Sequence, residues 1–93
     1  MKVRVHLTGY LTDYAEGAES VELSLADDAV VGDAMSELWR RYLGLRDRVI
    51  TEQGQLRQHV LLVVGNDLLD RNNLRAPLRE GDEISILPAV TGG

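Results

Sequence analysis

The stretch VGDAMSELWRRY, residues 31–42, decides the fold, because the spacing of apolar side chains changes there from every second residue to every third or fourth. The apolar residues fall on one helical face, and they are Val31, Ala34, Met35, Leu38, Trp39 and Tyr42. This spacing predicts a helix of about 13 residues, with Trp39 in the core or at its rim. Basic Arg40 and Arg41 near the end of the helix suit its dipole, and Gly44 is placed to terminate it.

Two strands are predicted before this helix. Residues 2–8 alternate strictly between apolar and polar side chains, which is typical of a half-buried strand. Residues 21–25 repeat the alternation. The segment between them, residues 9–18, carries glycines and acidic residues and is predicted to be a connecting loop, with Leu11 tucked beneath it. Two neighbouring half-buried strands joined by a loop favour an antiparallel hairpin.

The chain after the helix predicts further strands. Residues 45–56 form a polar connector in which a short helical turn is possible, and residues 60–64, VLLVV, form a continuous apolar run. Such a run indicates a strand that is covered on both faces or that uses an exposed apolar face for contacts. Residues 65–67 have turn chemistry, and Leu68 with Leu69 forms a brief strand. The last strand is predicted at residues 83–88.

This order predicts a two-layer α+β domain with one main helix on one face of a mixed sheet of four or five strands. It fits the β-grasp, or ubiquitin-like, fold, in which the first and last strands are adjacent and parallel at the centre. Residues 1–88 are predicted to form this domain and residues 89–93 a flexible tail. The sheet face without the helix is predicted to carry Arg4, His6, Glu22, Leu61, Val63, Ser85 and Leu87.

An apolar island is predicted on that uncovered face, formed by Leu61, Val63 and Leu87 and surrounded by charged residues. Contiguous exposed apolar patches on soluble proteins usually mark contact sites, which favours a partner-binding surface. The alternatives are that loops cover the island or that it mediates self-association.

Composition excludes several classes of function. The chain has 93 residues, enough for one domain, and a formal net charge of −5, which disfavours nucleic acid and anionic membranes as partners. It has no cysteine, which removes disulfides, thiolate metal sites and cysteine nucleophiles. The two histidines, His6 and His59, are too few for a zinc site unaided. Without a signal peptide or an apolar run of membrane-spanning length, we expect a cytoplasmic protein.

The sequence ends in Gly92-Gly93, directly after the last predicted strand. Chain ends are usually frayed and unimportant; alternatively, the terminal carboxylate is itself the reactive group. No nucleophile–base pair, phosphate-binding glycine loop or metal-ligand spacing is present, so we expect no catalytic residues and no bound cofactor or metal. Paired carboxylates such as Asp27-Asp28 lie in turns and are predicted to be solvated.

The chain resembles the ubiquitin-like sulfur carriers of the MoaD/ThiS family over essentially its whole length. The matching features are Val30-Val31-Gly32-Asp33 at the start of the helix, residues 38–42 before a glycine-leucine, the Gly65-Asn66-Asp67 turn, Arg79-Glu80-Gly81-Asp82-Glu83, and the ending Ile86-Leu87-Pro88-Ala89-Val90-Thr91-Gly92-Gly93. Their combination is more specific than any one of them. The ending resembles that of carriers that deliver sulfur for cysteine biosynthesis.

This resemblance implies a carrier that is modified at Gly93. A ubiquitin-activating-like adenylyltransferase would use ATP to join AMP to the Gly93 carboxylate. A sulfurtransferase or sulfide would then displace AMP and leave a thiocarboxylate, and an acceptor synthase, cysteine synthase-like or a molybdopterin synthase large subunit, would take the sulfur. Gly92 without a side chain would let the tail thread a narrow channel. The residues expected to bind partners are Leu61, Val63, Leu87, Pro88 and Val90.

Two other functions stay open. The chain would be a molybdopterin synthase small subunit whose tail stays in a partner's active site, or a ubiquitin-like modifier joined to proteins through Gly93. Lys2 is the only lysine, which disfavours a polymeric tag but not single attachment. The acceptor pathway is not fixed by the sequence, and tRNA- or sugar-thiolation enzymes and thiazole synthase are open as well.

Overall fold

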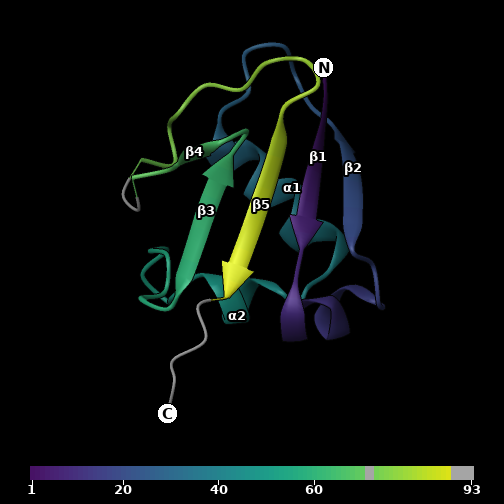
Figure 1. The fold of residues 1–93 in the computed structure, drawn as a ribbon, viewed down its shortest axis with the longest axis vertical. Coiled ribbons are helices and arrows are strands. Elements are labelled where there is room, and N and C mark those ends of the chain that lie inside the picture. Colours follow the sequence, from purple (N-terminus) through teal and green to yellow (C-terminus); the bar gives the residue numbers. More distant parts are fainter. Residues whose placement is uncertain (71–72, 89–93) are drawn as a thin grey trace.

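The computed structural model describes residues 1–70 and 73–88. In chain order their elements are β1 (Lys2–Leu7), the 3-10 helix η1 (Gly9–Ala15), β2 (Ser20–Ser24), α1 (Val31–Arg41), α2 (Arg46–Val49), β3 (Val60–Val64), β4 (Asp67–Leu68) and β5 (Glu83–Pro88). The strands of these residues form one five-stranded sheet in the order β2-β1-β5-β3-β4, as Figure 1 shows. The predicted mixed sheet with α1 on one face is confirmed.

The centre of the sheet is the parallel pair of β1 and β5, in which Val5 lies opposite Ile84 and Leu7 opposite Ile86. β2 pairs antiparallel with β1, and β3 pairs antiparallel with β5. The predicted hairpin and the predicted adjacency of the first and last strands are therefore both confirmed. This is the β-grasp arrangement.

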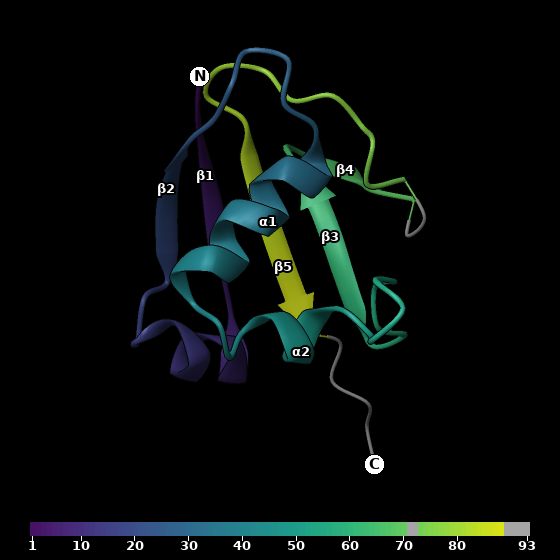
Figure 2. The same cartoon turned by 180° about the vertical axis from the view of Figure 1, so that it is seen from behind.

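The core lies between the sheet and α1, which crosses behind the sheet in Figure 1 and in front of it in Figure 2. Alternation along the strands sends every second side chain inward, so Val5, Ile84 and Ile86 are completely buried. From α1, Leu38 is completely buried, while Trp39 is half-buried against the core rim as predicted. Burial of each such aliphatic side chain stabilises the fold by about 1.5–3 kcal/mol.

Helix α1 begins where predicted but ends earlier. At its start the Val30 backbone N–H donates to the Asp33 carboxylate at 2.8 Å, which satisfies one of the unpaired amides of the first turn. The helix has 11 residues, and the cap residue Tyr42 leaves the helical region with φ −131° and ψ 86°. The prediction that Gly44 ends the helix is wrong, because the chain turns away earlier and buries Leu45 completely.

The segment predicted as a loop at residues 9–18 contains the 3-10 helix η1. Leu11 and Ala15, both completely buried, anchor it to the core, which confirms that Leu11 packs beneath this segment. Glu16 ends η1 with a left-handed φ of 56°. The helical turn in the polar connector is confirmed as α2, whose Val49 is completely buried.

Candidate partner-binding face

The face of the sheet opposite α1 is not covered by a helix among the described residues, and Figure 1 looks onto it. We call it the open face. The structure places on it all seven residues that alternation assigned there: Arg4, His6, Glu22, Leu61, Val63, Ser85 and Leu87. Most of their neighbours along each strand are buried, and Val64 and Pro88 are half-buried, which agrees with the predicted strand register.

Apolar side chains of three neighbouring strands meet on the open face. Leu61 of β3 lies directly opposite Leu87 of β5, and Val63 of β3 lies directly opposite Leu68 of β4. Leu61 is 36% exposed and Leu68 64%, while Val63 and Leu87 are half-buried. These four residues form one surface, which we call the apolar patch. No described loop closes over its most exposed members, so the predicted island is accessible.

Leu68 extends the patch beyond the sequence prediction, which gave it no role in the site. Gly65 and Asn66 form the turn between β3 and β4, and Gly65 has a φ of 64°. A two-residue turn with positive φ at its first position pairs the residues that are equally distant from it. Val63 and Leu68 therefore share a face. The glycine-asparagine pair after an apolar strand was the signal that would have identified Leu68.

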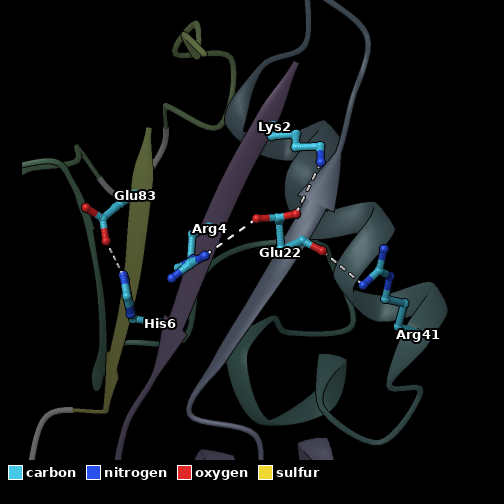
Figure 3. Close-up of polar contacts among 6 residues, drawn as sticks. All are labelled: Lys2, Arg4, His6, Glu22, Arg41 and Glu83. Atoms are coloured by element: carbon cyan, nitrogen blue, oxygen red, sulfur yellow. Dashed lines mark hydrogen bonds and ion pairs between the residues drawn. The ribbon is translucent and has the colours of Figure 1, made fainter. Parts of the chain in front are cut away.

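The other half of the open face is charged and its groups are paired, as Figure 3 shows. The Glu22 carboxylate lies 3.6 Å from Lys2 Nζ and 3.5 Å from an Arg4 guanidinium nitrogen. His6 Nε2 contacts the Glu83 carboxylate across the central β1–β5 pair. These pairs are partly solvent-exposed and contribute little stability each. They do place fixed charges of both signs beside the apolar patch.

The remaining predicted site residues lie at the end of β5. Pro88 is the last described residue of β5 and lies opposite Val60. Val90, Gly92 and Gly93 lie outside the described residues, and so does the predicted tail 89–93 as a whole. The domain boundary at residue 88 and the roles of these residues therefore stay predictions.

Perturbed ionisation is found on α1, on the opposite side of the sheet from the open face. Arg40 donates hydrogen bonds to the Glu37 carboxylate at 2.7 and 3.1 Å. These bonds, helped by the charge of the guanidinium, hold the pKa of Glu37 below its usual value and raise the pKa of Arg40. The pair is exposed and is not part of a cleft that would suggest catalysis.

Residues 1–70 and 73–88 lack the features of two other kinds of site. Among these residues there is no group of three histidine or carboxylate side chains that could hold a metal ion. None of the described helices is long and apolar enough to cross a membrane.

Comparison with known protein families identifies the family of this chain. The model of the ThiS family matches residues 5–93. The chain belongs to the ThiS family. The match includes the open face from His6 of β1 to Leu87 of β5 as well as the glycine ending.

Curated relatives of this ThiS-family protein are sulfur carriers and small protein modifiers. Small archaeal modifier protein 3 of Haloferax volcanii is 36% identical over 78 residues, 83% of this chain and 84% of that protein. The sulfur carrier protein CysO of Mycobacterium tuberculosis is 30% identical over 96 residues and is matched over the whole of both chains. By their names, one of these relatives is a protein modifier and the other a sulfur carrier.

Solved structures match this ThiS-family protein over its full length. The modifier SAMP1 from Haloferax volcanii has a TM-score of 0.89 with 28% identity and full coverage of both chains. The Amycolatopsis orientalis BexX/CysO complex matches with a TM-score of 0.84 and 28% identity, covering 98% of this chain and 99% of that one. A complex of subunits 1 and 2 of the Helicobacter pylori molybdopterin-converting factor matches with a TM-score of 0.63, 26% identity and full coverage. Related proteins thus form complexes with protein partners.

Proposed function

We propose that this ThiS-family protein is a cytoplasmic sulfur carrier whose Gly93 carboxylate is adenylated and then converted to a thiocarboxylate. The observation that carries the proposal is the full-length match to a sulfur carrier in a chain that ends in Gly92-Gly93. The absence of cysteine supports it, since no thiol in the chain can hold sulfur as a persulfide. ATP would be consumed by the partner enzyme.

The proposed chemistry balances at the carboxylate. A free carboxylate is a poor acyl donor, so the partner enzyme joins AMP to it and releases pyrophosphate from ATP. Sulfide, or a sulfur donor together with a reductant, then displaces AMP and leaves sulfur in place of one oxygen of Gly93. The acceptor enzyme takes that sulfur, and water supplies the oxygen that restores the carboxylate of Gly93. No residue of this chain need act as acid or base in these steps.

The apolar patch supports the partner half of the proposal. Leu61 and Leu87 lie side by side at the end of the sheet where β5 ends, so a protein bound there also reaches the chain that follows Pro88. We propose that Leu61, Val63 and Leu87, with Pro88 and Val90, contact the adenylyltransferase and the acceptor enzyme. Leu68 joins them as an exposed member of the same surface.

Intact mass tests this function directly. The protein is incubated with the adenylyltransferase of its own cell, ATP and sulfide, and a thiocarboxylate raises its mass by about 16 Da because sulfur replaces oxygen. The matched control lacks Gly92-Gly93 and is expected to fold normally without gaining this mass. An unchanged mass of the full chain after verified turnover of ATP, or an equal gain in the truncated chain, would contradict the proposal.

A second function, covalent attachment to other proteins through Gly93, is favoured by the small archaeal modifier relatives. The lysine available for self-linkage is Lys2, whose side chain is 65% exposed and lies near Glu22. Conjugates would add the mass of a whole protein and would disappear in the variant without Gly92-Gly93. A stable complex with a second subunit, as in the Helicobacter pylori structure, would instead favour the molybdopterin alternative.

A further inference from the structure

A second surface lies at the end of the sheet where β5 ends, between η1 and α2. Figure 1 and Figure 2 both place η1 and α2 at this end. It is a cleft lined by Tyr10, Tyr14, Asp47, Arg48, Arg57 and His59. None of these residues belongs to the apolar patch, and the proposed function has not used them. We call this surface the basic cleft.

The basic cleft adjoins the point where the chain leaves the sheet. Val60, directly after His59, lies opposite Pro88 in the β3–β5 pair. Gly9, directly before Tyr10, packs so closely on Pro88 that a Cβ atom at Gly9 would lie 3.3 Å from Pro88 Cγ. Tyr10 and His59, which line the cleft, are therefore each adjacent in sequence to a residue that contacts Pro88. Pro88, the last described residue of β5, therefore lies beside the cleft.

The charge of the cleft is opposite to that of the chain. Two arginines, Arg48 and Arg57, line the cleft beside one carboxylate, that of Asp47, in a protein whose net charge is −5. That carboxylate also lies 3.4 Å from an Arg46 guanidinium nitrogen, which offsets its charge. A local cationic surface in an acidic protein favours contact with anionic groups through charge complementarity.

The two arginines are held in place before any partner arrives. The Arg48 guanidinium carbon lies 4.6 Å from the centre of the Tyr14 ring, within cation–π range. Arg57 Nε donates to the Asp47 backbone carbonyl at 2.7 Å. Side chains fixed in this way lose less conformational entropy on binding. Tyr10, 44% exposed, adds an aromatic surface at the rim.

We propose that the basic cleft is a docking site for an acidic segment of the proteins that engage residues 89–93. The proposal rests on the proposed function, because it takes those residues as the segment that partners handle. The planar Arg48 side chain suits carboxylates, which guanidinium groups bind with directed hydrogen bonds. A phosphate group is a poorer fit, because backbone amides near the cleft, such as that of Arg48 bonded to the Leu45 carbonyl, are already used.

A peptide titration tests the docking site without any enzyme. A hexaglutamate peptide is added to the full chain, and amide NMR signals of Tyr10, Arg48 and His59 are expected to shift, whereas hexaglutamine leaves them unchanged. Arg48→Glu is expected to weaken hexaglutamate binding about tenfold. Arg79→Glu, an equal charge change at an exposed position before β5, is the matched control and keeps the affinity. Shifts confined to other residues, equal affinities of the two variants, or no binding would each overturn the proposal.

An activation assay separates this proposal from the proposed function. ATP–pyrophosphate exchange by the cell's own adenylyltransferase is measured with each variant, after thermal unfolding has shown that both fold. Arg48→Glu is expected to lower kcat/KM about tenfold at low salt, less at high salt, and Arg79→Glu is not. Failure of the wild-type chain to support exchange contradicts the proposed function. Exchange that is normal in both variants contradicts the docking site alone.

Discussion

The adjacent residues Leu61 and Leu62 allow a sharp test of how β3 divides its side chains between the core and the open face. Leu62 is 1% exposed in the core, whereas Leu61 is 36% exposed in the apolar patch. Truncation of Leu62 to alanine removes buried methyl groups and leaves a cavity, which costs about 2–5 kcal/mol. The same truncation at Leu61 leaves no closed cavity and costs about 1 kcal/mol.

Thermal unfolding followed by circular dichroism measures this difference. In a domain of this size each kcal/mol lowers the melting temperature by about 4–8 °C, so Leu62→Ala is expected to melt at least about 4 °C below Leu61→Ala. Leu61→Ala, although folded, is expected to be activated more slowly by the adenylyltransferase. Equal destabilisation by the two substitutions would refute the reasoning, because a strand shifted by one residue exchanges its core and open faces.

Two further predictions concern α1. Asp33→Ala removes the acceptor of the Val30 amide and is expected to lower the free energy of unfolding by about 1 kcal/mol, measured by urea denaturation; an unchanged midpoint would show that this cap contributes nothing. Because Arg40 lowers the pKa of folded Glu37, the contribution of this pair is present at neutral pH and lost as the pH falls through that lowered pKa. Glu37→Gln should therefore destabilise slightly at neutral pH and low salt but not in acid, and an equal effect at both pH values would contradict the ion pair.

The fold was predictable because its main signals are periodic. Alternation at residues 2–8 and 21–25 and the helical spacing at residues 31–42 agree with the observed elements. The same alternation identifies which strand residues lie on the open face. The end of α1 was not predictable from Gly44, because burial of Leu45 outweighed the preference of glycine for a helix end. Propensity is a weak signal where tertiary packing competes.

The parts that sequence reasoning missed have weak or nonlocal signals. The 3-10 helix η1 buries only Leu11 and Ala15 completely, and this sparse spacing gives no clear periodic signal. The basic cleft joins Tyr10 to His59, residues far apart in the chain that are brought together only when β3 pairs with β5 beside η1. The prediction of the apolar patch was nearly complete. Of its four residues, only Leu68 could not be assigned without the geometry of the turn between β3 and β4.

The parallel pairing of β1 with β5 also determines how the protein bears load. The chain starts β1 at one end of the sheet, and β5 ends at the other, as Figure 1 shows. Because β5 is bonded to β1 on one side and to β3 on the other, tension applied at Pro88 shears both sets of hydrogen bonds along their length rather than opening them one at a time. A partner that pulls on Pro88 along β5 would therefore load the hydrogen bonds to both flanking strands at once.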